Sequence, residues 1–409
     1  MTTTPVRPVS LTEMLEPNVL ANPYPLYARL RQESPVLWDP FLHAWVITRY
    51  DDVAEVLGKF RAERTPTPER LTELGMQRLA PVAEIMVKQM LFMDPPEQRR
   101  VRGLASNAFT ARRVGQLRDH IRDIANGLID RVVADGEMDL INDFANPLPA
   151  IVTAEMLGVP TEDHEQLKDW TQTFAEVIGN FQLNPDGIDV VLDSVSKLTG
   201  YLKDALARDS DEAPIGLIGL MSHAQIHGDR FTEDELIANV IVTMVGGHET
   251  TTNLIGNGLL TLLGEPAALS QMRDDPAIMP TAIEELLRYE SPVQTTARIA
   301  PEDTVLCDQP IEQGDAVIAV IAAANRDPER FADPDRLDLT RKDNRHLAFG
   351  WGSHFCFGAP LARIESEIAF HALLTRLPEL ELAGGPLQRD WRANLGLRGL
   401  MTLPIRWRP

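Results

Sequence analysis

One cysteine lies in a stretch of glycines and aromatic residues where a reactive sulfur could do chemistry. Residues 349–358 read FGWGSHFCFG, and Cys356 is one of only two cysteines in 409 residues. A helix is expected directly after it, so main-chain N–H groups and the positive end of the helix dipole favour the thiolate. Gly352 and Gly358 let the backbone approach a bulky group, and Phe349 helps to exclude water. Such a thiolate suits a soft metal ligand, although a free cysteine is usually a small buried hydrophobic residue.

A second polar group interrupts a long apolar stretch. Residues 245–253 read VGGHETTTN. Gly246 and Thr250 are four residues apart and share a helix face, and two adjacent glycines let a flat ligand lie against the backbone. The Glu249 carboxylate beside them can pass protons inward. The alternative is a simple kink, relieved by threonines that bond back to carbonyls.

The same stretch also begins like a zinc-hydrolase motif, H-E-x-x-H, at His248 and Glu249. That motif requires a second histidine where this chain has Thr252. Because one metal ligand is missing, zinc hydrolysis is strongly disfavoured.

The cysteine stretch resembles the haem-binding signature of the cytochrome P450 family, F-x-x-G-x-x-x-C-x-G. Phe349, Gly352, Cys356 and Gly358 occupy its defined positions. The resemblance implies that Cys356 ligates the iron of haem b through its thiolate, a ligand that favours O–O bond cleavage over reversible oxygen carriage. It extends over nearly the whole chain.

The polar stretch resembles the oxygen-activation motif of the same family, [AG]-G-x-[DE]-T-T. Gly246, Gly247, Glu249, Thr250 and Thr251 match it. The resemblance implies that the two glycines adjoin the haem, that the threonines assist oxygen activation and that Glu249 relays protons.

A structural triad is implied by the E-x-x-R motif of the family. Glu285 and Arg288 are three residues apart on one predicted helix face, where Glu284 could pair with Arg288 equally well. The resemblance supplies Arg336, in FADPDRLDL, as the third member.

Haem also carries two propionates, which need cationic partners. Arg102, Arg298 and His354 match the positions that bind propionates in the family, and arginine suits this task because its guanidinium binds carboxylates at two points. Many members carry a histidine where this chain has Gln98, which can still donate a hydrogen bond.

The substrate pocket is expected between the loop at 62–92, the long helix, and two later segments. No cationic residue stands out there, so an apolar or weakly polar substrate is predicted. The candidate pocket residues are Phe174, Ile178, Val242, Val245, Val293, Thr295, Leu395 and Leu397.

Electrons are expected to come from separate proteins, because no flavin or ferredoxin module is recognisable in the sequence. We expect a ferredoxin or flavodoxin with its NAD(P)H-dependent reductase, docking on the face nearest the cysteine. Arg102 and Arg363 are candidate contacts for an acidic partner, since local patches steer association.

Composition limits the other possible partners. The net charge of -21 disfavours nucleic acid, whose phosphates would be repelled, and two cysteines cannot form a disulfide framework. Neither a signal peptide nor a membrane-spanning stretch is recognisable, so a cytoplasmic protein without a membrane anchor is expected. Nothing in the sequence demands more than a monomer.

The elements that must position these residues are mainly helices. A capping box at Thr232 and Glu235 opens a helix that runs to Leu263, and shorter helices are predicted between Pro280 and Pro292 and over 360–377. VLWDP and AWVITRY predict a hairpin, and TVLCD and AVIAVIA predict strands. We expect a mainly α fold with a minor β portion. The resemblance implies a triangular prism formed by one domain over 1–409, with haem between the long helix and the cysteine loop.

The predicted function is that of a haem-thiolate monooxygenase, which inserts one oxygen atom from O2 by hydroxylation, dealkylation or epoxidation. Two alternatives stay open. One is a peroxide-driven peroxygenase, which the intact acid–alcohol pair disfavours. The other is a non-catalytic haem sensor, in which that pair would have no purpose.

Overall fold

The structure is a computed structural model that describes most of the chain, namely residues 9–164, 166–167, 169–171, 173, 188–208, 216–226, 228–384 and 390–408. The helices are α1 (Pro17–Ala21), α2 (Tyr24–Glu33), α3 (Tyr50–Lys59), α4 (Pro68–Glu73), α5 (Ala80–Met86), α6 (Glu97–Ala108), α7 (Ala111–Gln116), α8 (Arg118–Asp130), α9 (Pro147–Leu157), α11 (Ile188–Arg208), α12 (Gly216–Ser222), α13 (Glu233–Gly264), α14 (Pro266–Asp274), α15 (Met279–Tyr289), α16 (Ile321–Ala324) and α17 (Ala359–Arg376). The strands are β1 (Val36–Asp39), β2 (Ala44–Ile47), β3 (Glu137–Asp139), β4 (Thr295–Ile299), β5 (Thr304–Leu306), β6 (Gln309–Ile311), β7 (Ala316–Val320), β8 (Glu381–Leu382) and β9 (Pro404–Arg406).

Helix α13 is the central element, and its predicted start is confirmed. The Thr232 hydroxyl accepts from the Glu235 N–H at 3.2 Å, and the Glu235 carboxylate accepts from the Thr232 N–H at 2.9 Å. Both bonds satisfy N–H groups that a helix start leaves without intrahelical partners. The helix spans 32 residues and ends at Gly264, just before Pro266. It packs against α9, α15 and α17, which explains why its residues are apolar on most sides.

A small sheet forms the β portion, in the order β1-β2-β7-β4. The predicted hairpin is confirmed, because β1 and β2 pair antiparallel with Trp38 opposite Trp45. Strand β7 pairs parallel with β2, placing Val317 opposite Trp45, and pairs antiparallel with β4 on its other side.

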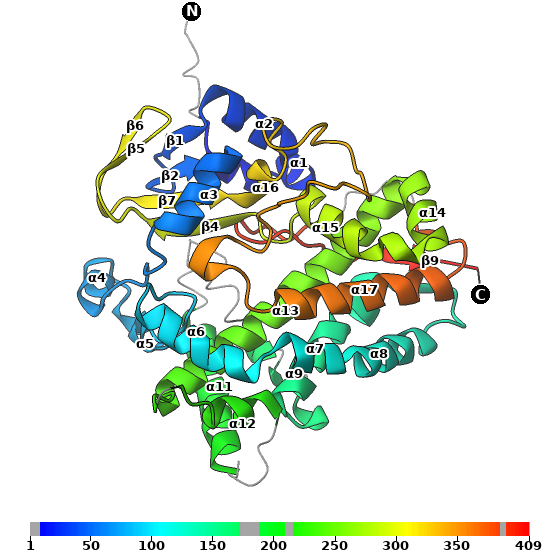
Figure 1. Ribbon diagram of the computed structural model, residues 1–409, viewed down its shortest axis with the longest axis horizontal. Coiled ribbons are helices and arrows are strands. Elements are labelled where there is room, and N and C mark those ends of the chain that lie inside the picture. Colours follow the sequence, from blue (N-terminus) through cyan, green and yellow to red (C-terminus); the bar gives the residue numbers. More distant parts are fainter. Residues whose placement is uncertain are drawn as a thin grey trace, which may run out of the picture.

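Figure 1 shows how these parts meet. The sheet and helices α1–α3 gather at one side, and the longer helices α8, α13 and α17 fill the other. The loop before α17, drawn in orange, lies between them at the front. Two further strand groups, β3-β9-β8 and β5-β6, lie outside the main sheet. In the part of the chain that the structure describes, no helix combines the length and apolar character needed to cross a bilayer.

Candidate active site

The cysteine loop places the Cys356 sulfur at the start of α17. The Cys356 N–H donates to the Phe349 carbonyl at 2.7 Å, which closes the loop. Gly352 has a φ of +69°, and a Cβ there would lie 3.2 Å from the Gly58 Cα, so the position requires glycine. Burial raises the pKa of the Cys356 thiol, while the N–H groups of Gly358 and Ala359 oppose that shift. These N–H groups are the helix-start donors that the sequence predicted.

Two side chains of α6 donate hydrogen bonds to main-chain carbonyls of this loop. Gln98 donates to the Ser353 carbonyl at 2.8 Å. Arg102 donates to the same carbonyl at 3.2 Å and to the Phe355 carbonyl at 2.7 Å. Both residues therefore lie at the loop, and the Arg102 charge also opposes the rise in the Cys356 pKa.

A cluster of basic side chains lies next to the loop. The Nε of Arg298 and the Nε2 of His354 are buried and have no hydrogen-bond partner among the described residues. Burial lowers the pKa of Arg298 to about 10, and burial together with the Arg298 charge lowers the pKa of His354 to about 4. Arg64, which stacks on Phe92 at 4.5 Å, belongs to the same cluster. Burial and the Arg298 charge lower its pKa to about 9.

This cluster fits the propionates of a haem. Buried cations are costly without a counter-charge, and among the described residues Asp94 is the carboxylate that raises the pKa values of Arg64, Arg298 and His354. A dianionic group would supply that charge beside the thiol. Arg64 was missed by sequence reasoning, because only its burial distinguishes it from other loop arginines.

The two glycines of the polar stretch face different neighbours. A Cβ on Gly246 would meet nothing within 4 Å, so this face of α13 is open. A Cβ on Gly247 would lie 2.9 Å from the Thr153 hydroxyl, so Gly247 packs against α9. The prediction that both glycines lie on the haem side is therefore wrong for Gly247, since successive helix residues point about 100° apart.

The two candidate catalytic threonines, Thr250 and Thr251, lie on different sides of α13. The Thr250 hydroxyl donates to the Gly246 carbonyl at 3.0 Å on the open face. Thr251 is buried on the side of α13 that packs against α17, near the Glu365 carboxyl group. Burial raises the pKa of Glu365 to about 8. Thr251 thus stands in a helix–helix contact, contrary to its predicted catalytic place, because its position on α13 turns it away from Thr250.

Glu249 lines a cavity on the flank of α13. Its carboxylate pairs with Arg392 at 2.5 Å. The cavity has a volume of about 240 Å³ and is lined by Ile141, Asn142, Asn146, Asp169, Thr171, Val245, His248, Glu249, Thr252, Asn253, Arg392, Leu400 and Met401. The His248 imidazole lies 2.5 Å from the Asn146 amide oxygen, so it takes part in the contact between α13 and α9.

The predicted ion pair at the E-x-x-R motif is confirmed, with a different third member. Glu285 and Arg288 are fully buried and pair at 2.8 Å. The second arginine on Glu285 is Arg341, at 3.1 Å, whereas the Arg336 side chain is 67% exposed and pairs with Asp338. The prediction of Arg336 is wrong because the chain turns here, and only its carbonyl reaches Arg288.

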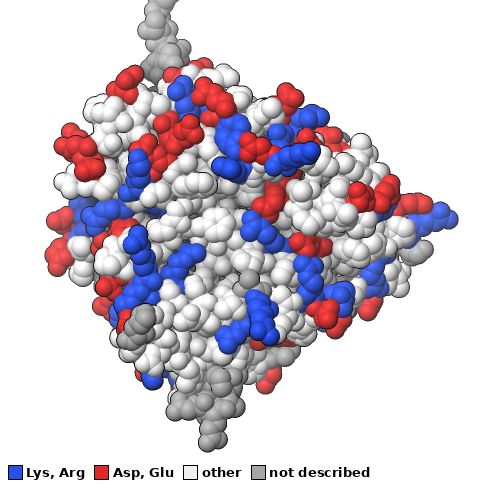
Figure 2. Space-filling view, in the orientation of Figure 1, with Lys and Arg blue, Asp and Glu red and all other residues white. Residues whose placement is uncertain are grey.

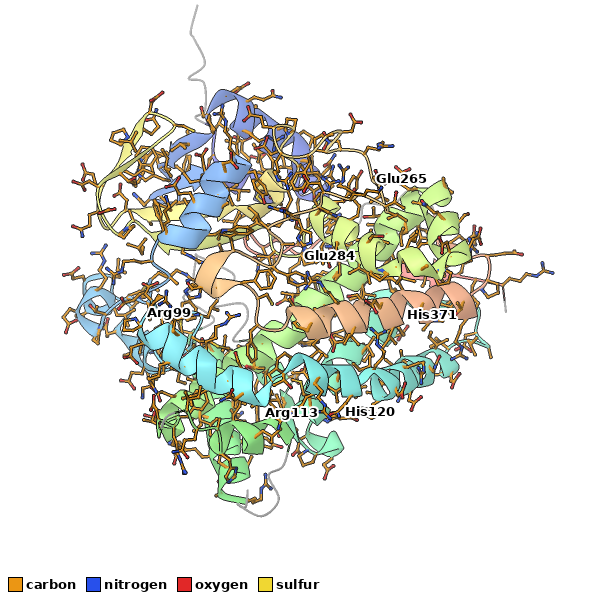
Figure 3. The ribbon with its side chains drawn as sticks, viewed as in Figure 1. Arg99, Arg113, His120, Glu265, Glu284 and His371 are labelled. Carbon is orange, nitrogen blue, oxygen red and sulfur yellow. The ribbon has the colours of Figure 1, made fainter. Side chains whose placement is uncertain are left out.

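Glu284 has other partners than Arg288. It binds Arg363 at 2.6 Å and His346 at 3.2 Å, so Arg363 is tied to α15. Burial alone would raise the pKa of Glu284, but the bonds from Arg363 and His346 lower it to about 2. Figure 3 shows Glu284 between α15 and the cysteine loop.

The residues predicted to line the substrate pocket lie in different environments. Val242 and Val245 are half-buried on α13, and Val293 forms a bridge with Leu397. Thr295 and Leu395 are buried and joined by a 3.0 Å bond from the Thr295 hydroxyl to the Leu395 carbonyl. Leu395 also packs into the buried cluster around α2. Phe174 and Ile178 lie outside the described residues.

Comparisons with known proteins agree with this arrangement. A family model described as Cytochrome P450 matches residues 202–382. Cytochrome P450 107B1 of Saccharopolyspora erythraea is 40% identical over 93% of this chain and 94% of its own. Cytochrome P450 monooxygenase PikC of Streptomyces venezuelae is 39% identical over 99% of this chain and 96% of its own. The structure of P450BioI bound to an acyl carrier protein is 36% identical, with a TM-score of 0.89 over 97% of this chain and 100% of that one. A thiol at a helix start, buried cations beside it and relatives that match almost end to end show that the chain belongs to the cytochrome P450 family of haem-thiolate monooxygenases.

Proposed function

We propose that Cys356 is the thiolate ligand of the haem iron and that Arg298, His354 and Arg64 bind the propionates, with Arg102 at the adjoining edge of the loop. The observation that carries this assignment is the group of buried nitrogens without partners beside the thiol. Thiolate-ligated haem supplies the activation of O2 when bound. Phe349, Gly352 and Gly358 belong to the loop that would adjoin the haem, and Gly246 leaves one face of α13 open.

Thr250 and Glu249 are proposed to supply protons on the open face of α13. Because the Thr250 hydroxyl donates its own proton to the Gly246 carbonyl, its oxygen is left to accept a further hydrogen bond. Glu249 provides the acid–base group. Such a pair serves monooxygenation, which consumes protons, better than it serves a gas sensor.

The chain is proposed to work as one cytoplasmic domain that receives electrons from a ferredoxin or flavodoxin and its reductase. Its substrate is inferred to be apolar or weakly polar, contacting Val242, Val245, Val293 and Leu397. Two relatives fit this inference. One is the Vitamin D(3) 25-hydroxylase of Pseudonocardia autotrophica, at 38% identity, and the other is P450BioI, whose partner carries hexadec-9Z-enoic acid.

Carbon monoxide binding to the reduced protein tests the ligand assignment. The purified protein is expected to show the strongly red-shifted Soret band of thiolate ligation, and Cys356→Ala should abolish it. Cys307→Ala, which removes the other cysteine, is the matched control and should leave the band unchanged. A histidine-type spectrum in the wild-type protein would reject the assignment.

Turnover with a reductase–ferredoxin pair separates monooxygenase from peroxygenase function. Because the acid–alcohol pair is intact, turnover with the electron donors should greatly exceed turnover with peroxide alone. The reverse order would favour the peroxygenase.

A further inference from the structure

A turn near the C-terminus, residues 394–397, is bound to the start of β4 by main-chain hydrogen bonds. The Gln294 N–H donates to the Gly396 carbonyl at 2.8 Å. The Arg398 N–H donates to the Pro292 carbonyl, also at 2.8 Å. The turn and the residues before β4 therefore form one hydrogen-bonded unit.

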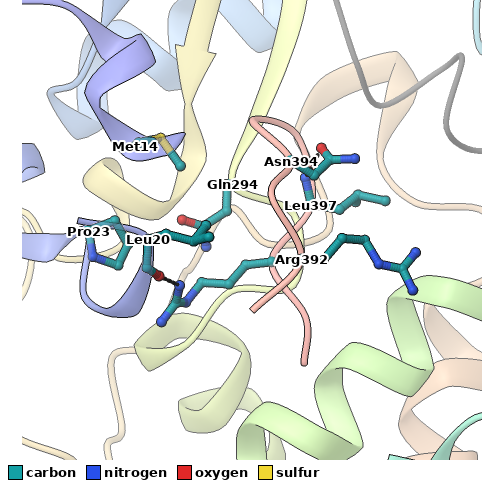
Figure 4. Close-up of a pocket in the computed structure, with 8 residues that line it drawn as sticks. Met14, Leu20, Pro23, Gln294, Arg392, Asn394 and Leu397 are labelled. Atoms are coloured by element: carbon teal, nitrogen blue, oxygen red, sulfur yellow. Dashed lines mark hydrogen bonds between the residues drawn. The ribbon is translucent and has the colours of Figure 1, made fainter. Parts of the chain in front are cut away.

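Val293 and Leu397 are the apolar side chains that this unit leaves partly uncovered. They lie opposite each other in a β-bridge, and both are half-buried. Their neighbours Gln294 and Leu395 are buried. Figure 4 shows Leu397 leaving the loop on the side away from Leu20. The two half-buried side chains are thus the part of the unit that remains able to contact a substrate.

The Arg398 side chain binds the unit to α1 and to the residue after α15. It is 5% exposed, and its guanidinium pairs with the Glu290 carboxylate. The same guanidinium donates to the Leu20 carbonyl at 2.6 Å and to the Ala21 carbonyl at 3.0 Å. These are the last two carbonyls of α1, and a cationic side chain is a favourable partner for such groups. The Trp391 ring covers the guanidinium at 3.5 Å.

The shape of the turn and its place in the molecule have different causes. The Asn394 side-chain oxygen accepts from the N–H groups of Gly396 at 2.8 Å and Leu397 at 3.0 Å, so the turn keeps its shape through its own residues. Its distance from α1 depends instead on Arg398, because a guanidinium is planar and bonds in fixed directions.

Little free space remains around this contact. The cavity between the loop and α1 has Met14, Leu20 and Pro23 on one side and Asn394 and Arg398 on the other. Its volume of about 10 Å³ holds at most one water molecule. The turn therefore cannot move toward α1 without displacing packed side chains.

We propose that Arg398 is a positioning residue that determines substrate specificity, because its bonds to Glu290 and to the end of α1 fix how far the adjacent Leu397 extends toward the substrate. This inference rests on the proposed function, in which Leu397 contacts the substrate. Consecutive residues of an extended segment point to opposite faces, so a movement that loosens Arg398 also turns Leu397. A turn held in this way discriminates between substrates by their length.

A series of N-alkylimidazoles of increasing chain length tests the proposal on the holoenzyme. The free imidazole nitrogen binds the haem iron and shifts the Soret band, so each Kd is measured without turnover. Each alkyl CH₂ that becomes buried should tighten Kd by about fourfold. Arg398→Lys keeps the positive charge but loses the forked bonds. It should raise the Kd of the long-chain ligands by about threefold to tenfold and leave the Kd of N-methylimidazole unchanged.

A double-mutant cycle with Leu397→Ala separates positioning from a general effect on the pocket. Leu397→Ala should weaken the long-chain ligands by a similar factor. In that background Arg398→Lys should change Kd by less than about twofold, because the side chain that Arg398 positions is gone. If Arg398→Lys does not yield folded holoenzyme, Glu290→Gln takes its place, since it removes the charge of the partner and keeps an oxygen acceptor.

Arg31→Lys is the matched control. Arg31 is also a buried arginine that donates to a main-chain carbonyl, that of Ala323 at 2.8 Å, but it lies on α2 and not on the turn. This variant should leave the dependence of Kd on chain length as it is in the wild-type protein.

The outcomes distinguish the two claims. If Leu397→Ala leaves the dependence of Kd on chain length unchanged, the substrate contact proposed for Leu397 is wrong, and the inference falls with it. If Leu397→Ala changes that dependence and Arg398→Lys does not, the contact stands and the role of Arg398 is overturned. That role is also overturned if Arg398→Lys keeps its full effect in the Leu397→Ala background, if it weakens N-methylimidazole equally, or if Arg31→Lys causes the same loss.

Discussion

The buried Arg298 and the partly buried Arg64, beside the Cys356 thiol, leave the charge of this site incomplete without an anion. Arg298 makes hydrogen bonds to the Ala297 carbonyl and the Thr296 hydroxyl, but these are neutral acceptors. Its charge also lowers the pKa of Arg64 and His354. The protein without haem therefore carries repulsion that the propionates would relieve.

Arg298→Met is expected to change stability in opposite directions with and without haem. Removing the buried charge should stabilise the haem-free protein by about 1–3 kcal/mol, because repulsion is lost, and should weaken haem retention, because a propionate loses its partner. Thermal unfolding of both forms measures this. Destabilisation of both forms would argue that Arg298 has a packing role only.

Glu365 should make the free energy of unfolding depend on pH. Its folded-state pKa of about 8 lies above the unfolded value near 4.5, so between these values the folded state holds one proton more. Stability contributed by the neutral carboxyl is therefore present below about pH 4.5 and lost as pH rises to about 8. Glu365→Gln should be more stable than wild type at pH 8, by roughly 2–4 kcal/mol, and nearly equal to it at pH 5.

Denaturant unfolding at the two pH values tests this. Glu367→Gln, two residues along the same helix and paired with Arg118 at the surface, is the control. If the free energies of unfolding of Glu365→Gln and wild type differ by the same amount at both pH values, the prediction is wrong.

At this scale the sequence predicts residues whose role is encoded in a short motif, such as Glu285 with Arg288. It does not predict which arginine approaches Glu285 from another segment. Arg341 and Arg336 are both near in sequence, and the turns between them decide which side chain is buried. Arg392 was missed for the same reason, since no local pattern distinguishes it from other loop arginines.

Among the elements, α13 depends on small residues where it meets its neighbours. A Cβ on Gly258 would lie 2.7 Å from the Phe370 ring of α17 and 3.2 Å from Leu286 of α15. Glycine thus permits a close approach of three helices at the cost of weaker helix propensity.

Gly258→Ala and Gly200→Ala should have opposite effects. The added methyl at Gly258 overpacks the contact and should destabilise the protein by about 1–3 kcal/mol. Gly200 lies exposed in α11 with nothing within 4 Å of a Cβ, so alanine there should stabilise by about 0.5–1 kcal/mol. Chemical denaturation of both variants checks the signs, and equal signs would contradict this account of the contact.

Element prediction succeeds where local signals are strong. The ends of α13, α15 and α17 agree with capping residues and prolines to within about two residues. The sequence does not predict the π-helical turn Leu140–Ala145 or the start of α9 at Pro147. Proline at the first turn of a helix and a break in a helix give similar sequence signals.

For the whole molecule, the pairing of β2 with β7 joins segments about 270 residues apart. A strand's own sequence does not specify such a distant partner, so this pairing comes from packing rather than from local pattern. The resemblance to the family, by contrast, predicts the complete fold, and the comparisons with known proteins confirm that fold.

The charge of the molecule is unevenly distributed, although its sum is -21. Figure 2 shows arginine and lysine side chains around an uncharged central region on the face that carries the cysteine loop. Arg99, on α6, lies on this face in Figure 3 and is exposed. Arg112, on α7, the helix that follows α6, is exposed too. A local positive patch can attract an acidic electron donor that the total charge repels.

Arg99→Gln and Arg112→Gln should each slow reduction by an acidic ferredoxin severalfold at low salt, because a rim charge acts mainly on the association rate. Near 1 M salt, where the screening length is about 3 Å, the variants should match wild type. Arg406→Gln changes the net charge by the same amount on β9, far from the cysteine loop, and should have no effect. Stopped-flow reduction at several salt concentrations measures this. An equal loss in Arg406→Gln would mean that total charge, and not the patch, governs docking.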